Sequence, residues 1–239
     1  MINKPLLKQS FKSTRILWFS ITFAMAGMLA QFIFLDFGEM VNMIYYKMTA
    51  VVLSGIYVMV SANKLIAVQV DRGSMAYIVS NPIKRSTVAL TQLFYLIITA
   101  MGSYTLTTIV HLISSTVKDT GETAANIIAI NVGAFLTTLV IAGICYMTSC
   151  IFNLSRHSLG LGGGIIAASF ICYFISMFSL MGTENMKYFK YATFITLYDI
   201  DSIILGNSEW VWKMFVLAGI AVITFIIGTI IFTKKDLPL

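Results

Sequence analysis

Long runs of apolar residues without a charged side chain recur along the 239-residue sequence. An ionised side chain at the bilayer centre costs roughly 2.5 to 3.5 kcal/mol, so such runs mark segments that cross a membrane. About 20 helical residues cover ~30 Å of hydrocarbon, whereas a membrane β-barrel shows short alternating strands. The pattern therefore predicts an all-α integral membrane protein with six transmembrane helices, at about 16–35, 46–67, 88–114, 125–151, 158–181 and 214–233.

Composition agrees with a single membrane domain over residues 1–239. Hydrophobic residues make up 58% of the chain and charged residues 11%, with a mean hydropathy of +0.88. A water-soluble domain would have about a quarter of its residues charged. The three cysteines and two histidines have no metal-ligand spacing, and the glycine run at 160–164 lacks the lysine of a phosphate-binding loop. We expect no catalytic residue, no metal and no bound cofactor in this chain.

The distribution of positive charge predicts the orientation. With six spans both termini lie on one side, and 11 of the 16 Lys and Arg residues fall in the segments of that side. Because cytoplasmic segments carry the excess of Lys and Arg, both termini are expected in the cytoplasm. The net charge of +6 then reflects topology, and no nucleic-acid partner is expected.

The N-terminal segment 2–15 has the pattern of an interfacial helix. At 100° per residue its four cations fall within about 80° of one another, with Ile2, Leu6 and Leu17 opposite. Such a helix would lie on anionic headgroups of the inner leaflet. A frayed basic tail that only fixes the topology is the alternative. The cations are Lys4, Lys8, Lys12 and Arg15.

The connection between the second and third spans, residues 69–87, predicts a short exposed helix. Gly73 and Ser74 can start a helix, and Asn81-Pro82 ends it before Lys84 and Arg85. An ordinary cytoplasmic hairpin is the alternative.

Three segments of the chain resemble the permeases of the ABC type-2 transporter family, the membrane subunits of type V ABC exporters. They are Asp71-Arg72-Gly73-Ser74, the YIVSNPIKRS segment at 77–86, and the closing FTKKDLPL at 232–239. The loop pattern of that family is matched by Ile78, Val79, Ser80, Pro82 and Arg85. Many relatives carry a glutamate before the glycine, where this chain has only Asp71.

This resemblance implies a dimer of two six-helix protomers, each docked to a separate ATPase subunit that binds ATP and Mg²⁺. The loop helix would sit in a groove of the ATPase, with Met75, Ile78 and Val79 as apolar anchors. Its flanking cations would meet an acidic rim. The residues implied in ATPase coupling are Arg72, Gly73, Ser74, Met75, Tyr77, Ile78, Val79, Pro82, Lys84 and Arg85.

The segment before the last span, residues 182–213, is too apolar for a solvated loop. The resemblance implies two short external helices that re-enter the outer leaflet, whereas an aromatic belt is the alternative. The aromatic residues concerned are Tyr188, Phe189, Tyr191, Phe194 and Tyr198.

No Asp, Glu, Lys or Arg lies deep within a predicted span, which favours a transporter powered from outside. His111, Asn131, Gln31 and Asn63 are expected to make hydrogen bonds between helices, and the glycine run at 160–164 to allow close helix packing. In size and layout the chain resembles permeases that export phenol-soluble modulins, which implies amphipathic or toxin peptides as substrates. The resemblance also implies a location in a bacterial cytoplasmic membrane, with membrane lipids as contacts. Export of drugs, lipids or ions, a self-sufficient secondary transporter and a membrane scaffold remain alternatives.

Overall fold

The structure is a computed structural model that describes residues 2–38, 40–75, 83–178 and 184–235. Six helical segments in these ranges are long and apolar enough to cross a membrane, and the same ranges contain no strand. The predicted multi-pass, all-helical membrane protein is thereby confirmed. The six segments are α1 (Lys4–Phe34), the segment Val41–Asp71, α5 (Arg85–Lys118), α6 (Ala124–Ile151), α7 (Ser155–Phe178) and α9 (Glu209–Lys234).

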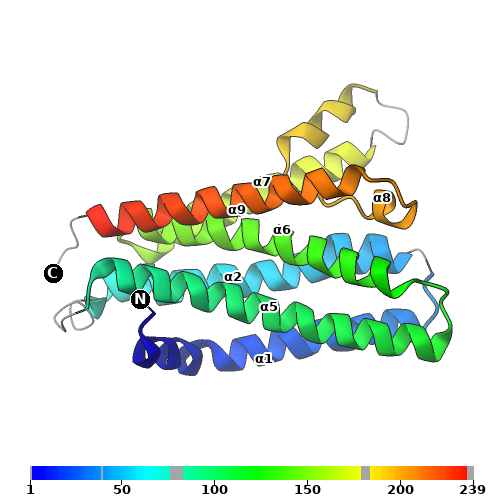
Figure 1. Ribbon diagram of the computed structural model, residues 1–239. Helices are drawn as coiled ribbons and strands as arrows, with labels where there is room; N and C mark the ends of the chain where they lie inside the picture. Colours follow the sequence, from blue (N-terminus) through cyan, green and yellow to red (C-terminus); the bar gives the residue numbers. More distant parts are fainter. Residues whose placement is uncertain (1, 39, 76–82, 179–183, 236–239) are drawn as a thin grey trace.

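The long helices form a bundle in which both ends of the chain lie toward the same end (Figure 1). Helix α6 is central and packs against α2, α5, α7 and α9. Helices α6 and α9 approach closely at two glycines: a Cβ atom at Gly228 would lie 2.8 Å from Tyr146 Cδ1, and one at Gly143 would clash with Thr224 Oγ1. In the glycine run, a Cβ atom at Gly162 would lie 2.8 Å from Thr148 Oγ1 of α6, whereas a Cβ atom at Gly160 or Gly164 would meet nothing within 4 Å. One glycine of the run thus has the expected packing role.

The second span is divided into three helical pieces. They are the π-helix η1 (Val41–Ala50), α2 (Val51–Leu65) and the short α3 (Ala67–Asp71), with Ile66 at φ −123° and ψ −72° between the last two. The predicted span 46–67 is shorter than the observed segment Val41–Asp71, because the charge of Lys47 marks the start of the charge-free run. Lys47 instead lies inside η1, where its Nζ is 3.1 Å from Asp201 Oδ2.

Helix α1 covers both the predicted interfacial helix and the first span without interruption. Ser10 and Thr14 each donate a hydrogen bond to the carbonyl four residues earlier, an arrangement that bends helices. In Figure 1 the first turns, in dark blue, lie across the long axis of the bundle. The side facing α5 is polar: Ser10 Oγ is 2.8 Å from Gln92 Oε1, and Thr14 contacts the Tyr95 hydroxyl. The four cations of the predicted interfacial helix, Lys4, Lys8, Lys12 and Arg15, are all exposed.

Three short helices follow α7 in the expected external segment: η3 (Glu184–Ala192), η4 (Ile195–Leu197) and α8 (Ile200–Ile204). Helix η3 packs on α7 toward the end of the bundle opposite the termini (Figure 1). Asp199 precedes α8 and accepts hydrogen bonds from the backbone N–H and the hydroxyl of Ser202, at 3.2 and 2.8 Å. Its Oδ2 also lies 2.5 Å from Lys213 Nζ, which joins the segment to α9.

Candidate functional site

The described part of the predicted coupling loop is attached to the bundle at both of its ends. On the first side Asp71, the last residue of α3, accepts a hydrogen bond from the backbone N–H of Ser155 at 3.1 Å. Ser155 opens α7, so this carboxylate caps the α7 N-terminus from another helix.

On the second side Arg85, the first residue of α5, donates from Nη1 to the Lys235 carbonyl at 2.8 Å. Lys235 in turn donates from Nζ to the carbonyls of Cys150 and Ile151 at the end of α6, at 3.3 and 2.6 Å. The C-terminal end of α9 is thus joined to the start of α5 and the end of α6. Residues 72–84 therefore lie between one attachment to α7 and another to α9.

The predicted coupling residues do not all share one surface. Arg72, Gly73 and Lys84 are exposed, and Gly73 has a φ of +69° that favours glycine. The Ser74 hydroxyl contacts the Gln69 side chain. Met75 is only 2% exposed and belongs to the chain's own hydrophobic core, so in this conformation it offers no surface to a partner. Tyr77, Ile78, Val79 and Pro82 lie outside the described residues.

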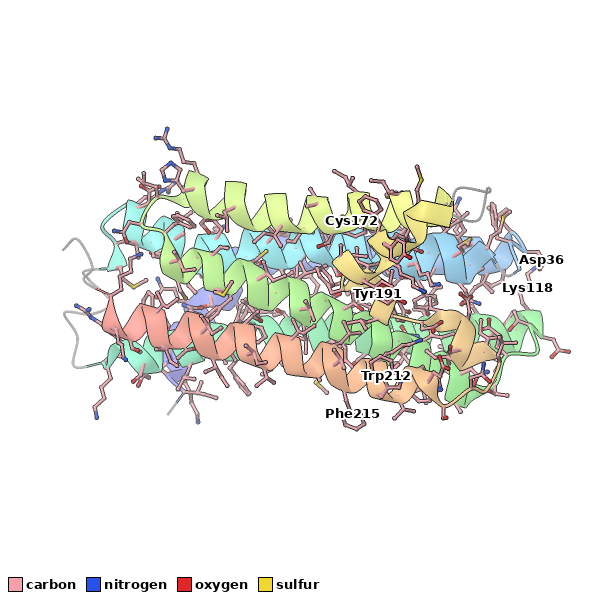
Figure 2. All side chains as sticks on the ribbon, turned by 90° about the horizontal axis from the view of Figure 1, so that it is seen from above. Asp36, Lys118, Cys172, Tyr191, Trp212 and Phe215 are labelled. Carbon is pink, nitrogen blue, oxygen red and sulfur yellow. The ribbon has the colours of Figure 1, made fainter. Side chains whose placement is uncertain are left out.

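A large pocket lies at the opposite end of the bundle. It has a volume of 1120 Å³ and is lined by the ends of α1, η1, α5 and α6 and by α8. Its charged lining residues include four acids but only two lysines, Lys47 and Lys118. Figure 2 shows Lys118 and Asp36 at this end of the bundle. The four acids are Asp36, Asp119, Glu122 and Asp201.

A chain of buried hydrogen bonds ends at the pocket. Asn131 Nδ2 donates to the Tyr46 hydroxyl at 2.9 Å, and Thr107 Oγ1 donates to Asn131 Oδ1 at 3.2 Å. The Tyr46 oxygen therefore accepts from Asn131, which leaves its own proton to be donated to His111 Nδ1, 2.6 Å away. With Nδ1 accepting, the proton of the neutral imidazole is on Nε2, which lies 2.9 Å from Glu122 Oε2.

The last donor of this chain, His111 Nε2, lies beside the Glu122 carboxylate. The hydrogen bond from His111 lowers the pKa of Glu122, and a hydrogen bond from the Asn42 side chain acts in the same direction, against the opposing effect of burial. The pocket therefore contains an ionised carboxylate. Two buried atoms here have no hydrogen-bond partner of standard geometry among the described residues: Asn42 Oδ1, and Glu122 Oε2, which His111 Nε2 approaches to 2.9 Å. His111 and Asn131 make the expected contacts between helices, which confirms the prediction for these two residues. Gln31 is instead exposed, and Asn63 Oδ1 is buried without a hydrogen-bond partner among the described residues.

The five aromatic residues predicted for the external segment are in three environments. Tyr188 and Tyr191 are 74% and 78% exposed, and Phe189 is also exposed. Phe194 is half-buried. Tyr198 is buried, and its hydroxyl donates to the Ile130 carbonyl of α6 at 2.8 Å. Tyr198 therefore belongs to the bundle core, whereas Tyr188, Phe189 and Tyr191 of η3 are exposed.

The sequence reasoning missed Tyr46, Asn42 and Glu122 as site residues. Tyr46 and Asn42 are four residues apart in the segment just before the second charge-free run, and Glu122 lies in the short loop before α6. The signal that could have found them is an acid in a short loop that follows a helix bearing a histidine. No protein-family model matches this sequence, and no curated protein matches it.

Proposed function

We propose that the chain is the membrane-spanning permease subunit of an ATP-driven ABC exporter. One observation carries the proposal: residues 72–84 lie between the Asp71–Ser155 contact with α7 and the Arg85–Lys235 contact with α9. Force applied to this segment by a partner would act on both helices at once. A connection of this kind can convert closure of a nucleotide-binding partner into movement of the transmembrane helices.

The partner in this proposal is a separate ATPase subunit that carries ATP and Mg²⁺, with two permease protomers in the assembly. Arg72 and Lys84 are exposed on either side of the loop and would contact acidic residues of the ATPase. The membrane would be a bacterial cytoplasmic membrane, with the termini on the ATPase side. The exported substrate would be an amphipathic or toxin peptide, which is the class exported by the permeases that the sequence resembles.

The test is purification of the chain in mild detergent from its native host, followed by identification of co-purifying proteins and an ATPase assay. We expect an ATPase in equal amount with the permease. The double variant Arg72→Glu/Lys84→Glu should lose the ATPase, because exposed cations at a contact set its charge complementarity.

The control is Lys190→Glu, a single charge reversal of the same kind at an exposed position of η3 near the other end of the bundle. It should retain the ATPase. A protein that purifies alone without ATP hydrolysis, or a double variant that behaves like the control, would contradict the proposal. The first result would favour a secondary transporter or a scaffold.

A further inference from the structure

The pocket opposite the termini contains hydrogen-bond acceptors that the protein itself does not saturate. Asn42 Oδ1 is buried and has no partner among the described residues, although Asn42 is only 8% exposed and lines the pocket. Leaving such an atom unpartnered costs free energy comparable to a lost hydrogen bond. An external donor that enters the pocket would remove this cost.

The neighbouring Glu122 carboxylate is also an acceptor. The hydrogen bonds in the chain Asn131–Tyr46–His111 all donate in its direction, so their dipoles stabilise a negative charge at the pocket. The two lysines that line the pocket do not pair with Glu122. Lys47 is paired with Asp201, and Lys118 lies 5.8 Å from the centre of the Phe34 ring.

The pocket wall also has an apolar part. Ile33, Ile130 and Ile200 are buried residues that line it, and Ile204 and Leu205 at its edge are exposed. A carboxylate that no lysine pairs with and an unpartnered carbonyl beside an apolar wall match a ligand that has several N–H donors, a positive charge and a hydrocarbon chain.

We infer that this pocket binds a protonated primary amine attached to an apolar chain, with the ammonium group between Glu122 and Asn42 Oδ1. The three N–H donors of an ammonium ion can bond both acceptors at once. Charge-assisted bonds to Glu122 would provide most of the selectivity. The π-helical geometry of η1 sets the positions of both Asn42 and Tyr46, and π-helical turns frequently occur at functional sites.

Binding is tested on the purified chain in phosphatidylcholine nanodiscs, without any ATPase, so failure of this inference is distinguishable from failure of the proposed function. The probe is radiolabelled hexylammonium in equilibrium dialysis, with empty nanodiscs as the background. Hexanol has the same tail without charge, and hexyltrimethylammonium has the tail and charge without N–H donors. We expect hexylammonium to bind most tightly of the three.

Two variants remove the acceptors separately. Glu122→Gln and Asn42→Leu should each weaken hexylammonium binding about tenfold or more, because each loses a hydrogen bond to a charged group. The control is Glu209→Gln, the same change at an exposed acid near the start of α9 that does not line the pocket. It should bind hexylammonium like the unmodified chain. Thermal unfolding of each variant verifies that it is folded.

The inference is overturned if hexylammonium does not bind above background, if hexanol binds equally well, or if both folded variants bind hexylammonium like the control. A lysine side chain on an amphipathic peptide offers the same chemistry as a free alkylamine. A peptide that displaces hexylammonium, when its lysine-acetylated form does not, identifies the lysine side chain as a source. Lack of displacement by either peptide restricts the site to small amphiphilic amines.

Discussion

Among single residues, Glu122 combines partial burial with an ionised carboxylate held by neighbours. The hydrogen bond from His111 lowers its pKa below the usual value for glutamate, despite the opposing effect of burial. A carboxyl group whose pKa is lower in the folded state stabilises the fold above its unfolded pKa. That contribution disappears as pH falls through the folded pKa.

We therefore expect Glu122→Gln to lower the unfolding temperature at pH 7 and to have a progressively smaller effect below about pH 4, where an unfolded glutamate takes up its proton. The measurement is thermal unfolding by intrinsic fluorescence in detergent over a series of pH values. Glu209→Gln, at an exposed acid, is the control and should show little change at any pH. A Glu122→Gln effect that is constant with pH would show that ionisation of Glu122 does not stabilise the fold.

The residue-level predictions from sequence are confirmed for His111 and Asn131, but not for Gln31 and Asn63, and they did not identify the partners. His111 and Asn131 were recognisable because a polar side chain in an apolar run needs a hydrogen bond. Their partner Tyr46 is 65 residues before His111 in the sequence, and Glu122 approaches from a loop. Such pairings depend on how the helices are arranged in space, which one sequence without relatives does not indicate.

Among helices, α6 and α9 make a close contact at Gly228 of α9, as they do at Gly143 of α6. A Cβ atom at Gly228 would lie 2.8 Å from Tyr146 Cδ1 and 3.0 Å from the backbone Cα of Met147. Close helix approach through small residues is a main source of association between membrane helices. We expect Gly228→Ala to destabilise the protein by about 1–3 kcal/mol, the typical cost of overpacking.

The control for this prediction is Gly219→Ala in the same helix, where a Cβ would meet nothing within 4 Å. Alanine there should be neutral or slightly stabilising, because it is the better helix former. Comparison of the urea or thermal unfolding of the two variants in detergent measures the difference. Equal stability of both variants would mean that α9 can shift away from Tyr146 without cost.

A second helix-level prediction concerns the contact between α3 and α7. Asp71→Ala removes the acceptor for the Ser155 backbone N–H and the negative charge at the N-terminus of α7. We expect faster hydrogen–deuterium exchange in the first turn of α7, at 155–158, with the middle of α7 unchanged. Glu209→Ala, at an exposed acid elsewhere, should leave exchange in this turn as it was. Unchanged exchange in Asp71→Ala would mean that the carboxylate does not hold the α7 terminus.

The lengths of the helices show what counting charges can and cannot predict. The predicted fourth span, 125–151, agrees closely with Ala124–Ile151, because one loop precedes this helix and another follows it directly. The predicted third and sixth spans are shorter than Arg85–Lys118 and Glu209–Lys234. Both helices begin and end with a charged residue, Arg85 and Lys118 in α5 and Glu209 and Lys234 in α9. Charge-free runs therefore identify the apolar part of a helix, and the helix continues beyond that part into turns that carry charged residues.

In the whole molecule, the two ends of the bundle differ in chemistry. The end that holds the chain termini has Asp71, Arg85 and Lys235 in contacts with backbone groups, which join α3 to α7 and the end of α9 to α5 and α6. The opposite end has a pocket with four acids and two lysines. The number of spans and their all-helical character followed from the sequence alone. The connections within the first end and the pocket at the second did not, because they join residues far apart in the chain.

The orientation of this bundle is open to a direct test. The excess of Lys and Arg predicts that the end with the termini is cytoplasmic. Single cysteines introduced at Lys12 and at Asn207, both exposed and at opposite ends, would report the side on which each lies. The native Cys145, Cys150 and Cys172 are first replaced by alanine or serine. A membrane-impermeant maleimide should label Asn207→Cys in intact cells and Lys12→Cys only after permeabilisation. The reverse pattern would place the pocket in the cytoplasm, and would remove the proposed ATPase contact at Arg72 and Lys84 because those cations would then lie outside the cell.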